Sequence, residues 1–268
     1  MKLNYQHLCE QVCKIAKDAG SFIRTEAKNF DRSKIEYKGL HNLVSYVDKA
    51  TENMIIEELD KLLPNAAFVA EESFTVLDQS LYKWIIDPLD GTTNFTHGLP
   101  CYCVSIALLE GDKLVVGVVY EVNLDECFYT WLDAPSYMNG ARISVSSINK
   151  INQSLIATGF PYTDYSRASP YMEVFDYCMV NSHGLRRLGS ACADIVYVAM
   201  GRLEAFYEYG LKPWDVAAGA LIVENAGGTV TDFKGGNDFI FGEEIITSNT
   251  HIHAEFLTVV KEKFEQKK

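Results

Sequence analysis

The sequence predicts a mixed α/β protein, and three stretches carry that prediction. Near the N-terminus, apolar residues recur at spacings of three and four, as on the buried face of a helix. Across residues 102–145 they follow the two-residue period of β-strands, with turn signals between the runs. After residue 151 helical and strand patterns alternate. The 268 residues suffice for one compact unit made of two halves, residues 1–150 and 151–268.

Two helices and a short β-segment are expected at the start of the chain. The residues that form the apolar face of the first helix are Leu8, Val12, Ile15, Ala19, Phe22 and Ile23. Residues 35–39 predict a strand or hairpin arm, and a second helix follows residues 44–48 and ends at Pro64. Asp48 lies near the start of that helix, where a carboxylate commonly meets free amides. Capping and a role in a functional site are equally good interpretations of Asp48.

The next two predicted strands, residues 68–70 and 84–86, both end in acidic side chains. The acids are Glu71 and Glu72 after the first strand, and Asp87 and Asp90 after the second. Pro88 removes a backbone donor, so the second strand should end there, and Gly91 permits a turn. If the two strands are parallel neighbours, their acids meet at the carboxyl edge of one sheet, where open α/β sheets place ligands.

This sheet edge predicts a divalent-cation site, because cations such as Mg²⁺ prefer carboxylate and carbonyl oxygens. The amides of Gly91 and Thr92, which open a helix, are suited to an anion beside the cation. The simpler interpretation is a strand–turn–helix corner whose acids only cap the helix.

The remaining elements complete the α/β pattern. Strands at 104–109, 114–120 and 127–131 are expected to form an antiparallel meander with a structural role. The second half predicts strands at 154–159, 204–208, 226–231 and 244–247, helices at 170–180, 190–200 and from residue 214, and a last helix that ends in the charged tail 261–268. Asp215 lies at or near the N-cap of the helix that starts at residue 214.

An arginine pair, Arg186 and Arg187, precedes the helix that Gly189 and Ser190 open. The two side chains could hold an anion, but an exposed or subunit-interface pair is the favoured interpretation.

Composition excludes some classes of protein. A net charge of −12 and a pI near 5.0 argue against a nucleic-acid surface, although bound cations could reverse the field locally for a phosphorylated substrate. No stretch is apolar and long enough for a signal core or a membrane span. Seven scattered cysteines without a Cys-x-x-Cys pair suit a reducing cytoplasm.

Three motifs resemble the inositol monophosphatase family of Mg²⁺-dependent, lithium-sensitive phosphatases. The motifs occur in the family's order at residues 69–73 (Val-Ala-Glu-Glu-Ser), 87–95 (Asp-Pro-Leu-Asp-Gly-Thr-Thr-Asn-Phe) and 214–219 (Trp-Asp-Val-Ala-Ala-Gly). Further positions that match are Lys38, Asp48, Gly189, Ser190, Ala191 and Glu208. The resemblance implies a layered αβαβα sandwich, as in inositol monophosphatases and fructose bisphosphatases, and a homodimer.

The resemblance also implies a role for each matching residue. Glu71, Asp87 and the Leu89 carbonyl would hold one metal ion; Asp87, Asp90 and Asp215 would hold a second, and two to three Mg²⁺ ions are expected per site. Lys38 and Glu72 would lie around these ligands and hold them in position without binding the metal themselves. Glu71 and the Thr92 hydroxyl, itself held by Asp48, would orient and deprotonate the attacking water. The implied substrate contacts are Asp90, Gly91, Thr92, Gly189, Ser190, Ala191, Glu208 and Asp215.

The predicted function is therefore hydrolysis of a small polyol phosphate, foremost myo-inositol monophosphate. Residues 93–95 (Thr-Asn-Phe), which follow the Gly-Thr pair, resemble the inositol monophosphatase branch more than the bisphosphate nucleotidase or fructose bisphosphatase branches, which remain alternatives. A haloacid dehalogenase-type phosphatase fits poorly, because it separates its aspartates by one residue rather than by Pro88 and Leu89. A non-catalytic metal-binding interaction protein is the alternative from another class.

Overall fold

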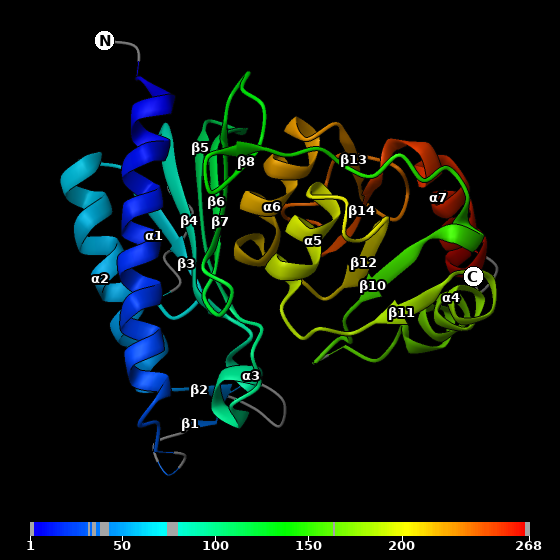
Figure 1. The fold of residues 1–268 in the computed structure, drawn as a ribbon, viewed down its shortest axis with the longest axis horizontal. Helices are drawn as coiled ribbons and strands as arrows, with labels where there is room; N and C mark the ends of the chain where they lie inside the picture. The colour runs from blue at the N-terminus through cyan, green and yellow to red at the C-terminus, as the bar shows by residue number, and fades with distance from the viewer. Residues whose placement is uncertain are drawn as a thin grey trace.

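The computed structural model describes residues 3–31, 33, 36–37, 43–73, 80–162 and 164–265. Their helices and strands form five layers in the order helix, sheet, helix, sheet, helix (Figure 1). This confirms the αβαβα architecture.

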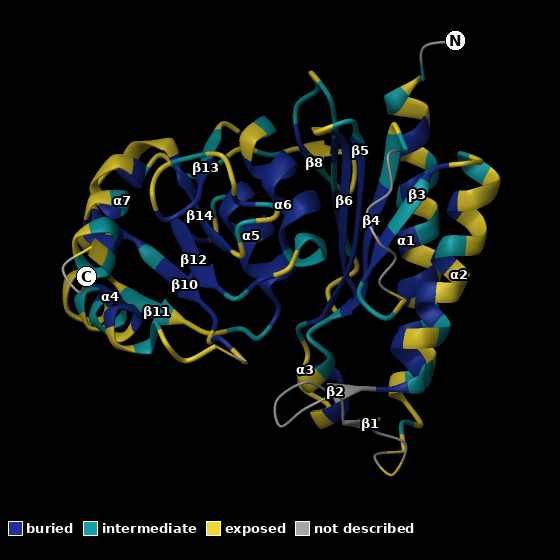
Figure 2. Cartoon of the chain, turned by 180° about the vertical axis from the view of Figure 1, so that it is seen from behind, coloured by how far each residue is buried: buried dark blue, intermediate teal, exposed yellow. Residues whose placement is uncertain are grey.

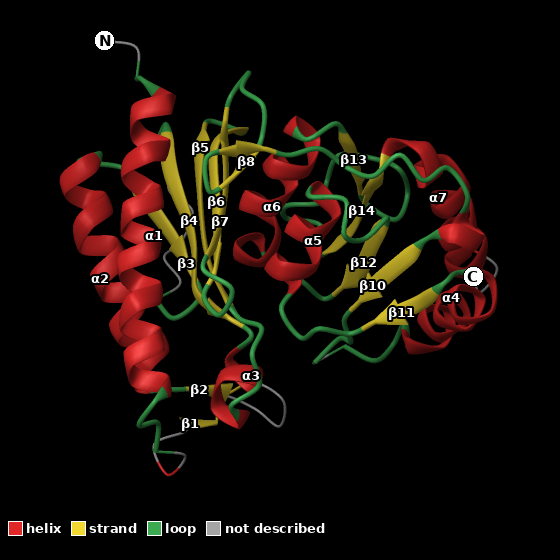
Figure 3. Cartoon of the chain, in the orientation of Figure 1, coloured by secondary structure: helices red, strands yellow, loops and turns green. Residues whose placement is uncertain are grey.

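The described elements follow the chain in this order. The helices are α1 (Tyr5–Ala27), α2 (Tyr46–Leu62), α3 (Thr92–His97), α4 (Ala168–Asn181), α5 (Ala191–Ala199), α6 (Pro213–Asn225) and α7 (Thr250–Glu265), with a 3₁₀ turn at Ile151–Gln153. The strands are β1 (Glu36–Tyr37), β2 (Leu43–Val44), β3 (Ala67–Ala70), β4 (Tyr82–Asp90), β5 (Cys103–Glu110), β6 (Lys113–Glu121), β7 (Glu126–Trp131), β8 (Tyr137–Met138), β9 (Ala141–Arg142), β10 (Leu155–Thr158), β11 (Gly184–Arg186), β12 (Ala205–Tyr209), β13 (Gly228–Thr231) and β14 (Glu244–Asn249). Figure 3 shows the large sheets in yellow, with α5 and α6 between them, α1 and α2 on one outer side, and α4 and α7 on the other.

The first large sheet has seven strands in chain order, from β3 to β9. β3 and β4 are parallel, with Ala70 opposite Ile86, so both strands end at the same edge as predicted. β5, β6 and β7 form the predicted antiparallel meander. One face of this sheet packs on α1 and α2 through an apolar core that includes Trp84, Ile106 and Tyr120. The buried faces and exposed outer helix surfaces are visible in Figure 2.

The opposite face of the first sheet packs on α5 and α6, which lie between the two sheets (Figure 1). A single buried cluster joins Ile85 and Phe128 of the first sheet to Val196 of α5 and Phe206 of the second sheet. The N-terminal and C-terminal halves therefore share a core, which is how a helix from residue 213 onward can bring side chains to the edge of a sheet built before residue 143.

The second sheet has the order β11-β10-β12-β14-β13, with parallel pairing from β11 to β12 and antiparallel pairing to β14 and β13. Its outer face is covered by α4 and α7, around an aromatic core that includes Tyr171, Tyr207 and Phe256. The short strand β11 is not among the elements predicted from the sequence. Of the predicted β-segment 35–39, residues 36–37 pair with β2, and the rest lies outside the described residues. None of the described helices has the length and apolar character needed to cross a membrane.

Candidate functional site: an acidic cavity between the sheets

A bulge at the end of β4 brings Asp87 and Asp90 to the same side. We expected β4 to stop at Asp87, but the strand continues to Asp90, and its pairing with β5 shifts between these residues. Three steps of a regular strand would turn the two side chains to opposite faces. The bulge interrupts this alternation, so that the side chain of Asp90 points to the same side of the sheet as that of Asp87. Pro88, which has no amide hydrogen, lies within this irregularity.

Asp215 reaches the same place from α6. The helix begins at Pro213, and Asp215 caps it from within, since its Oδ2 accepts the Lys212 amide at 2.6 Å. Ser105, opposite Asp87 on β5, donates its hydroxyl to the Trp214 carbonyl at 3.0 Å. This bond ties the start of α6 to the strand beside Asp87. The predicted placement of Asp215 near a helix start is therefore confirmed, and the capping interpretation is correct as well.

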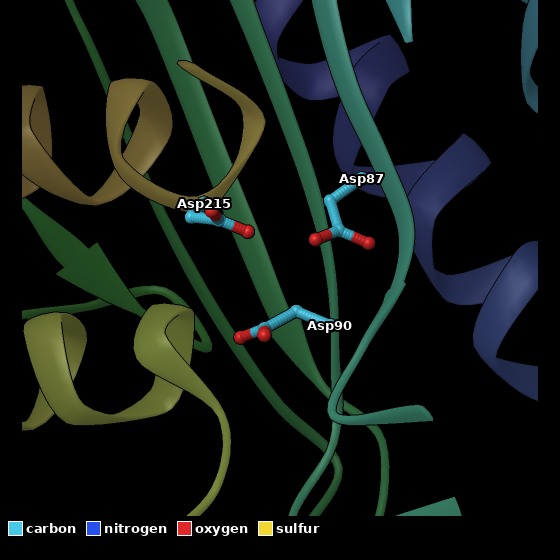
Figure 4. A group of neighbouring side chains, drawn as sticks. All are labelled: Asp87, Asp90 and Asp215. Atoms are coloured by element: carbon cyan, nitrogen blue, oxygen red, sulfur yellow. The ribbon is translucent and has the colours of Figure 1, made fainter. Parts of the chain in front are cut away.

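The carboxyl groups of Asp87, Asp90 and Asp215 form one cluster. Each offers an oxygen that lies within 4.8 Å of the others, and Figure 4 shows the three groups gathered between β4 and the start of α6. Burial, followed by the charges of Glu71, Asp90 and Asp215, raises the pKa of Asp87 well above its usual range. Burial and the Asp90 charge raise the pKa of Asp215 to about 7. Carboxylates held together at this cost suit a divalent cation, whose charge would reverse the penalty.

Backbone and hydroxyl donors hold these carboxylates in place. One oxygen of Asp87 accepts the Leu89 amide at 2.9 Å. Asp90 Oδ2 accepts the Ser190 hydroxyl at 2.5 Å and the Cys192 amide at 2.7 Å, both from the start of α5. Because these donors belong to fixed turns, the acids are oriented before any ligand arrives.

Thr92 connects the cavity to a buried acid behind it. Its hydroxyl lies 2.8 Å from Asp48 Oδ1 and 3.0 Å from the Leu89 carbonyl. Asp48 is fully buried and also accepts the amide and hydroxyl of Ser45, the N-cap of α2. The capping interpretation of Asp48 is therefore confirmed, while its role in a functional site stays a prediction, with which the contact to Thr92 is compatible.

Gly91 and Asn94 shape the turn between the clustered carboxyl groups and α5. Gly91 has φ +97°, a left-handed conformation, and a Cβ there would lie 2.9 Å from the Cys101 carbonyl. Asn94 donates to the carbonyls of Cys101 and Leu188, both at 2.8 Å. These bonds fix the loop that carries Gly189 against α3.

Most residues predicted for the site line one cavity of about 290 Å³. They are Glu71, Asp87, Leu89, Asp90, Gly91, Thr92, Gly189, Ser190, Ala191, Glu208 and Asp215. Glu72 lies outside this lining, and its amide donates to the buried Glu52 of α2 at 2.8 Å. Lys38 lies outside the described residues.

Several cavity-lining residues are not among those predicted. Asp194, Tyr162 and Lys212 line the cavity, as does Arg187, whose guanidinium donates to the Tyr162 hydroxyl at 2.8 Å. Arg186 and Arg187 are both exposed, in line with the favoured interpretation, but Arg187 also reaches the cavity. Asp194 had a sequence signal, since it is the one charged residue of the otherwise apolar helix α5. Tyr162 lies in a loop and had none.

The layered fold and the acidic cavity together define an α/β protein with a candidate divalent-cation site. The chain belongs to the inositol monophosphatase family, whose sequence pattern it matches over residues 4–265.

Individual relatives carry two kinds of name. The chain is 38% identical to the putative Nus factor SuhB of Neisseria meningitidis serogroup B, over 92% of this chain and 95% of the relative. It is 36% identical to the inositol-1-monophosphatase of Mesorhizobium japonicum, over 92% and 93% of the two chains. Among solved structures, the inositol monophosphatase of Anabaena (Nostoc) superposes with a TM-score of 0.86 at 33% identity and covers 97% of each chain.

Glu208 predicts a pH dependence of stability. Burial, then the Asp215 charge, raises the pKa of Glu208 to about 8, although Arg187 opposes the shift. The folded state therefore holds a proton that the unfolded chain releases near pH 4.3, so stability is lost as the pH rises toward about 8. In chelator, thermal unfolding should occur at lower temperature at pH 8 than at pH 6.5, and Glu208→Gln should reduce the difference. An unchanged difference in this variant would contradict the prediction.

Proposed function

We propose that the protein is a Mg²⁺-dependent phosphomonoesterase that hydrolyses a small polyol phosphate, with myo-inositol monophosphate as the leading candidate. Family membership supports a phosphatase. The observation that carries the proposal for this chain is the convergence of Asp87, Asp90 and Asp215 within 4.8 Å in a cavity that also presents the turn at Gly91 and Thr92.

The same acids are proposed to hold two to three Mg²⁺ ions. Glu71, Asp87 and the Leu89 carbonyl would hold one ion, and Asp87, Asp90 and Asp215 a second. Their oxygens are the hard donors that Mg²⁺ prefers. Burial and the neighbouring acids raise the pKa of Asp87, and bound cations would remove this penalty on its charged form. When bound, paired divalent ions neutralise charge on the phosphoryl group and lower the pKa of a nearby water.

The protein's own groups would then position the attacking water and the substrate. A hydroxyl has a single proton, so if Thr92 donates it to Asp48, the Thr92 oxygen is free to accept a hydrogen bond from water. Glu71, which lines the same cavity, would take the second proton of that water as a general base. The amides of Gly91 and Thr92 would bind the phosphate, and Gly189, Ser190, Ala191 and Glu208 would contact the alcohol portion.

Metal removal tests the proposal. The purified protein, stripped with a chelator, should not hydrolyse myo-inositol monophosphate, and added Mg²⁺ should restore turnover. Titration calorimetry should show Mg²⁺ binding to the parent protein that is lost in Asp90→Asn. Millimolar Li⁺ should slow the Mg²⁺-dependent turnover, as the family resemblance implies. Full activity after metal removal, or activity of Asp90→Asn equal to that of the parent, would overturn the proposal.

A comparison of candidate phosphate esters tests which of them is the preferred substrate. Steady-state kcat/KM values for myo-inositol monophosphate, a 3′(2′),5′-bisphosphate nucleotide, fructose 1,6-bisphosphate and histidinol phosphate should be largest for the inositol phosphate. A larger value for one of the bisphosphates would move the chain to the corresponding branch.

A second candidate is a non-catalytic role as a metal-binding interaction protein. The observation that favours it is the name of relatives such as the N. meningitidis protein, Nus factor, which is not the name of a phosphatase. Catalytic turnover that depends on Asp90 would argue against it.

We further propose a homodimer, implied by the family resemblance, and size-exclusion chromatography with light scattering tests it. We also propose a cytoplasmic location, because seven free cysteines suit a reducing compartment.

A further inference from the structure

Asp194 is a buried acid that lines the cavity without a role in the proposed chemistry. Its side chain is only 1% exposed, and its Oδ1 has no hydrogen-bond partner among the described residues. A buried carboxylate oxygen without a hydrogen-bond partner destabilises the folded state. Because Asp194 also lines the cavity, a bound ligand could supply the hydrogen bond that this oxygen lacks.

Helix capping does not account for Asp194. It lies in the first turn of α5, where a negative charge is favoured by the helix dipole. The donors of that turn are already used, however: Ser190 Oγ accepts the Ala193 amide at 3.2 Å, and Asp90 Oδ2 accepts the Cys192 amide at 2.7 Å. α5 thus has its cap without the Asp194 carboxyl group.

Ion pairing does not account for it either. Arg187 is close enough that its charge lowers the pKa of Asp194, but burial and the charges of Glu208 and Asp90 outweigh it and leave the pKa well above the usual range. The Arg187 guanidinium donates instead to Tyr162, and the salt bridges within the described ranges do not include a pair of Arg187 with Asp194. Asp194 and Glu208 are therefore two buried acids in the lining of one cavity, and neither forms a salt bridge within the part of the chain that the structure describes.

We propose that Asp194 is a specificity-determining residue that accepts a hydrogen bond from a hydroxyl group of the alcohol released from the phosphate, beside the contact expected of Glu208. An acceptor in this position selects hydroxyl donors, because a leaving group without them leaves a buried oxygen unsatisfied. The inference rests on the proposed phosphatase function and narrows its substrate to phosphate esters whose alcohol carries further hydroxyl groups.

Two variants and two substrates test the proposal. Asp194→Leu removes the acceptor at similar size, and Asp194→Asn keeps a neutral acceptor oxygen. The substrates are myo-inositol monophosphate and p-nitrophenyl phosphate, whose leaving group carries no further hydroxyl. For the inositol phosphate, kcat/KM should fall about 10- to 100-fold in the Leu variant and about 3- to 10-fold in the Asn variant, as expected for a lost charged or neutral hydrogen bond. For p-nitrophenyl phosphate, both variants should stay within about 2-fold of the parent.

The pattern of failure separates this inference from the proposed function. Equal losses on both substrates, or no loss on either, would overturn the role of Asp194 while leaving the phosphatase proposal in place. A parent protein that hydrolyses neither substrate in Mg²⁺ would instead overturn the proposed function, and this inference with it. Thermal unfolding of each variant shows whether it is folded, and the Asn variant carries the test alone if the Leu variant is not.

Discussion

Asp87→Asn is expected to abolish Mg²⁺-dependent hydrolysis, with a fall in kcat/KM of roughly 1000-fold or more. The proposed site assigns Asp87 to both metal ions, and the charge stabilisation that such ions supply is worth several kcal/mol in the transition state. The substitution keeps the Oδ1 acceptor that binds the Leu89 amide at 2.9 Å, so the local turn should persist. Steady-state kinetics on myo-inositol monophosphate measures the effect.

The same substitution should stabilise the protein when metal is absent. Asp87 is 1% exposed, and burial together with three neighbouring acids raises its pKa, so the neutral amide removes an unfavourable charge. Thermal unfolding in chelator should shift upward, by about 2–4 °C for each kcal/mol relieved. Mg²⁺ should raise the unfolding temperature of the parent but not of the variant. Opposite effects on activity and on stability distinguish a metal-binding acid from a merely structural one.

Asp232→Asn provides the matched control. Asp232 is also an aspartate with little exposure, at 7%, but it holds a turn, accepting the amides of Lys234 and Gly236, each at 2.8 Å. Its substitution should leave kcat/KM within about 2-fold and should lower stability, since the oxygen that accepts these amides loses its charge. An Asp87→Asn variant that behaves like this control, with activity retained, would refute the assignment of Asp87.

The sequence anticipated the parts of the fold that depend on periodic patterns. The apolar face of α1 and the alternation in β5 to β7 are local signals, because burial of one face imposes the helical or two-residue period. β3 and β4 are parallel neighbours, which is the condition under which their acidic ends are expected to meet at one edge of the sheet. Strand β11 was missed because its three residues, Gly184–Arg186, are too few to show a period.

The site was predictable in its residue types but not in its geometry. The bulge between Asp87 and Asp90 arises from pairing with β5, and no local rule states that a strand resumes after Pro88. Arg187 and Tyr162 meet only through tertiary contacts between residues 25 positions apart. Asp194 was visible as a lone acid in an apolar helix, but only the cavity shows that its Oδ1 lacks a partner among the described residues.

Thr92→Val is expected to lower kcat about 100-fold while KM stays close to that of the parent. Valine preserves the shape of threonine but removes the hydroxyl that lies 2.8 Å from Asp48 and 3.0 Å from the Leu89 carbonyl. In the proposed mechanism this oxygen orients the attacking water, a contribution of the size usually seen for positioned acid–base groups. Because the Gly91 and Thr92 amides that would bind the phosphate are unchanged, substrate affinity should be little affected.

Stability should fall as well, for a reason that concerns Asp48. This fully buried acid loses one donor in the variant, and an unsatisfied buried acceptor costs about 1–3 kcal/mol. A modest loss of stability cannot by itself lower kcat in a protein that remains folded at the assay temperature. Thr92→Ser, which restores the hydroxyl, should recover most of both quantities, and thermal unfolding of the two variants checks the structural part.

Thr96→Val separates the role of this hydroxyl from a general effect on α3. Thr96 belongs to the same helix and is 2% exposed, and its hydroxyl donates to the Thr93 carbonyl at 3.0 Å, away from the acids. Its variant should keep kcat within about 2-fold. Equal kcat losses in the two valine variants would show that α3 tolerates no change, and a Thr92→Val enzyme with parental kcat would show that another group orients the water. A selective loss at Thr92, rescued by serine, would place the hydroxyl in the reaction, because this oxygen links the cavity lining to Asp48.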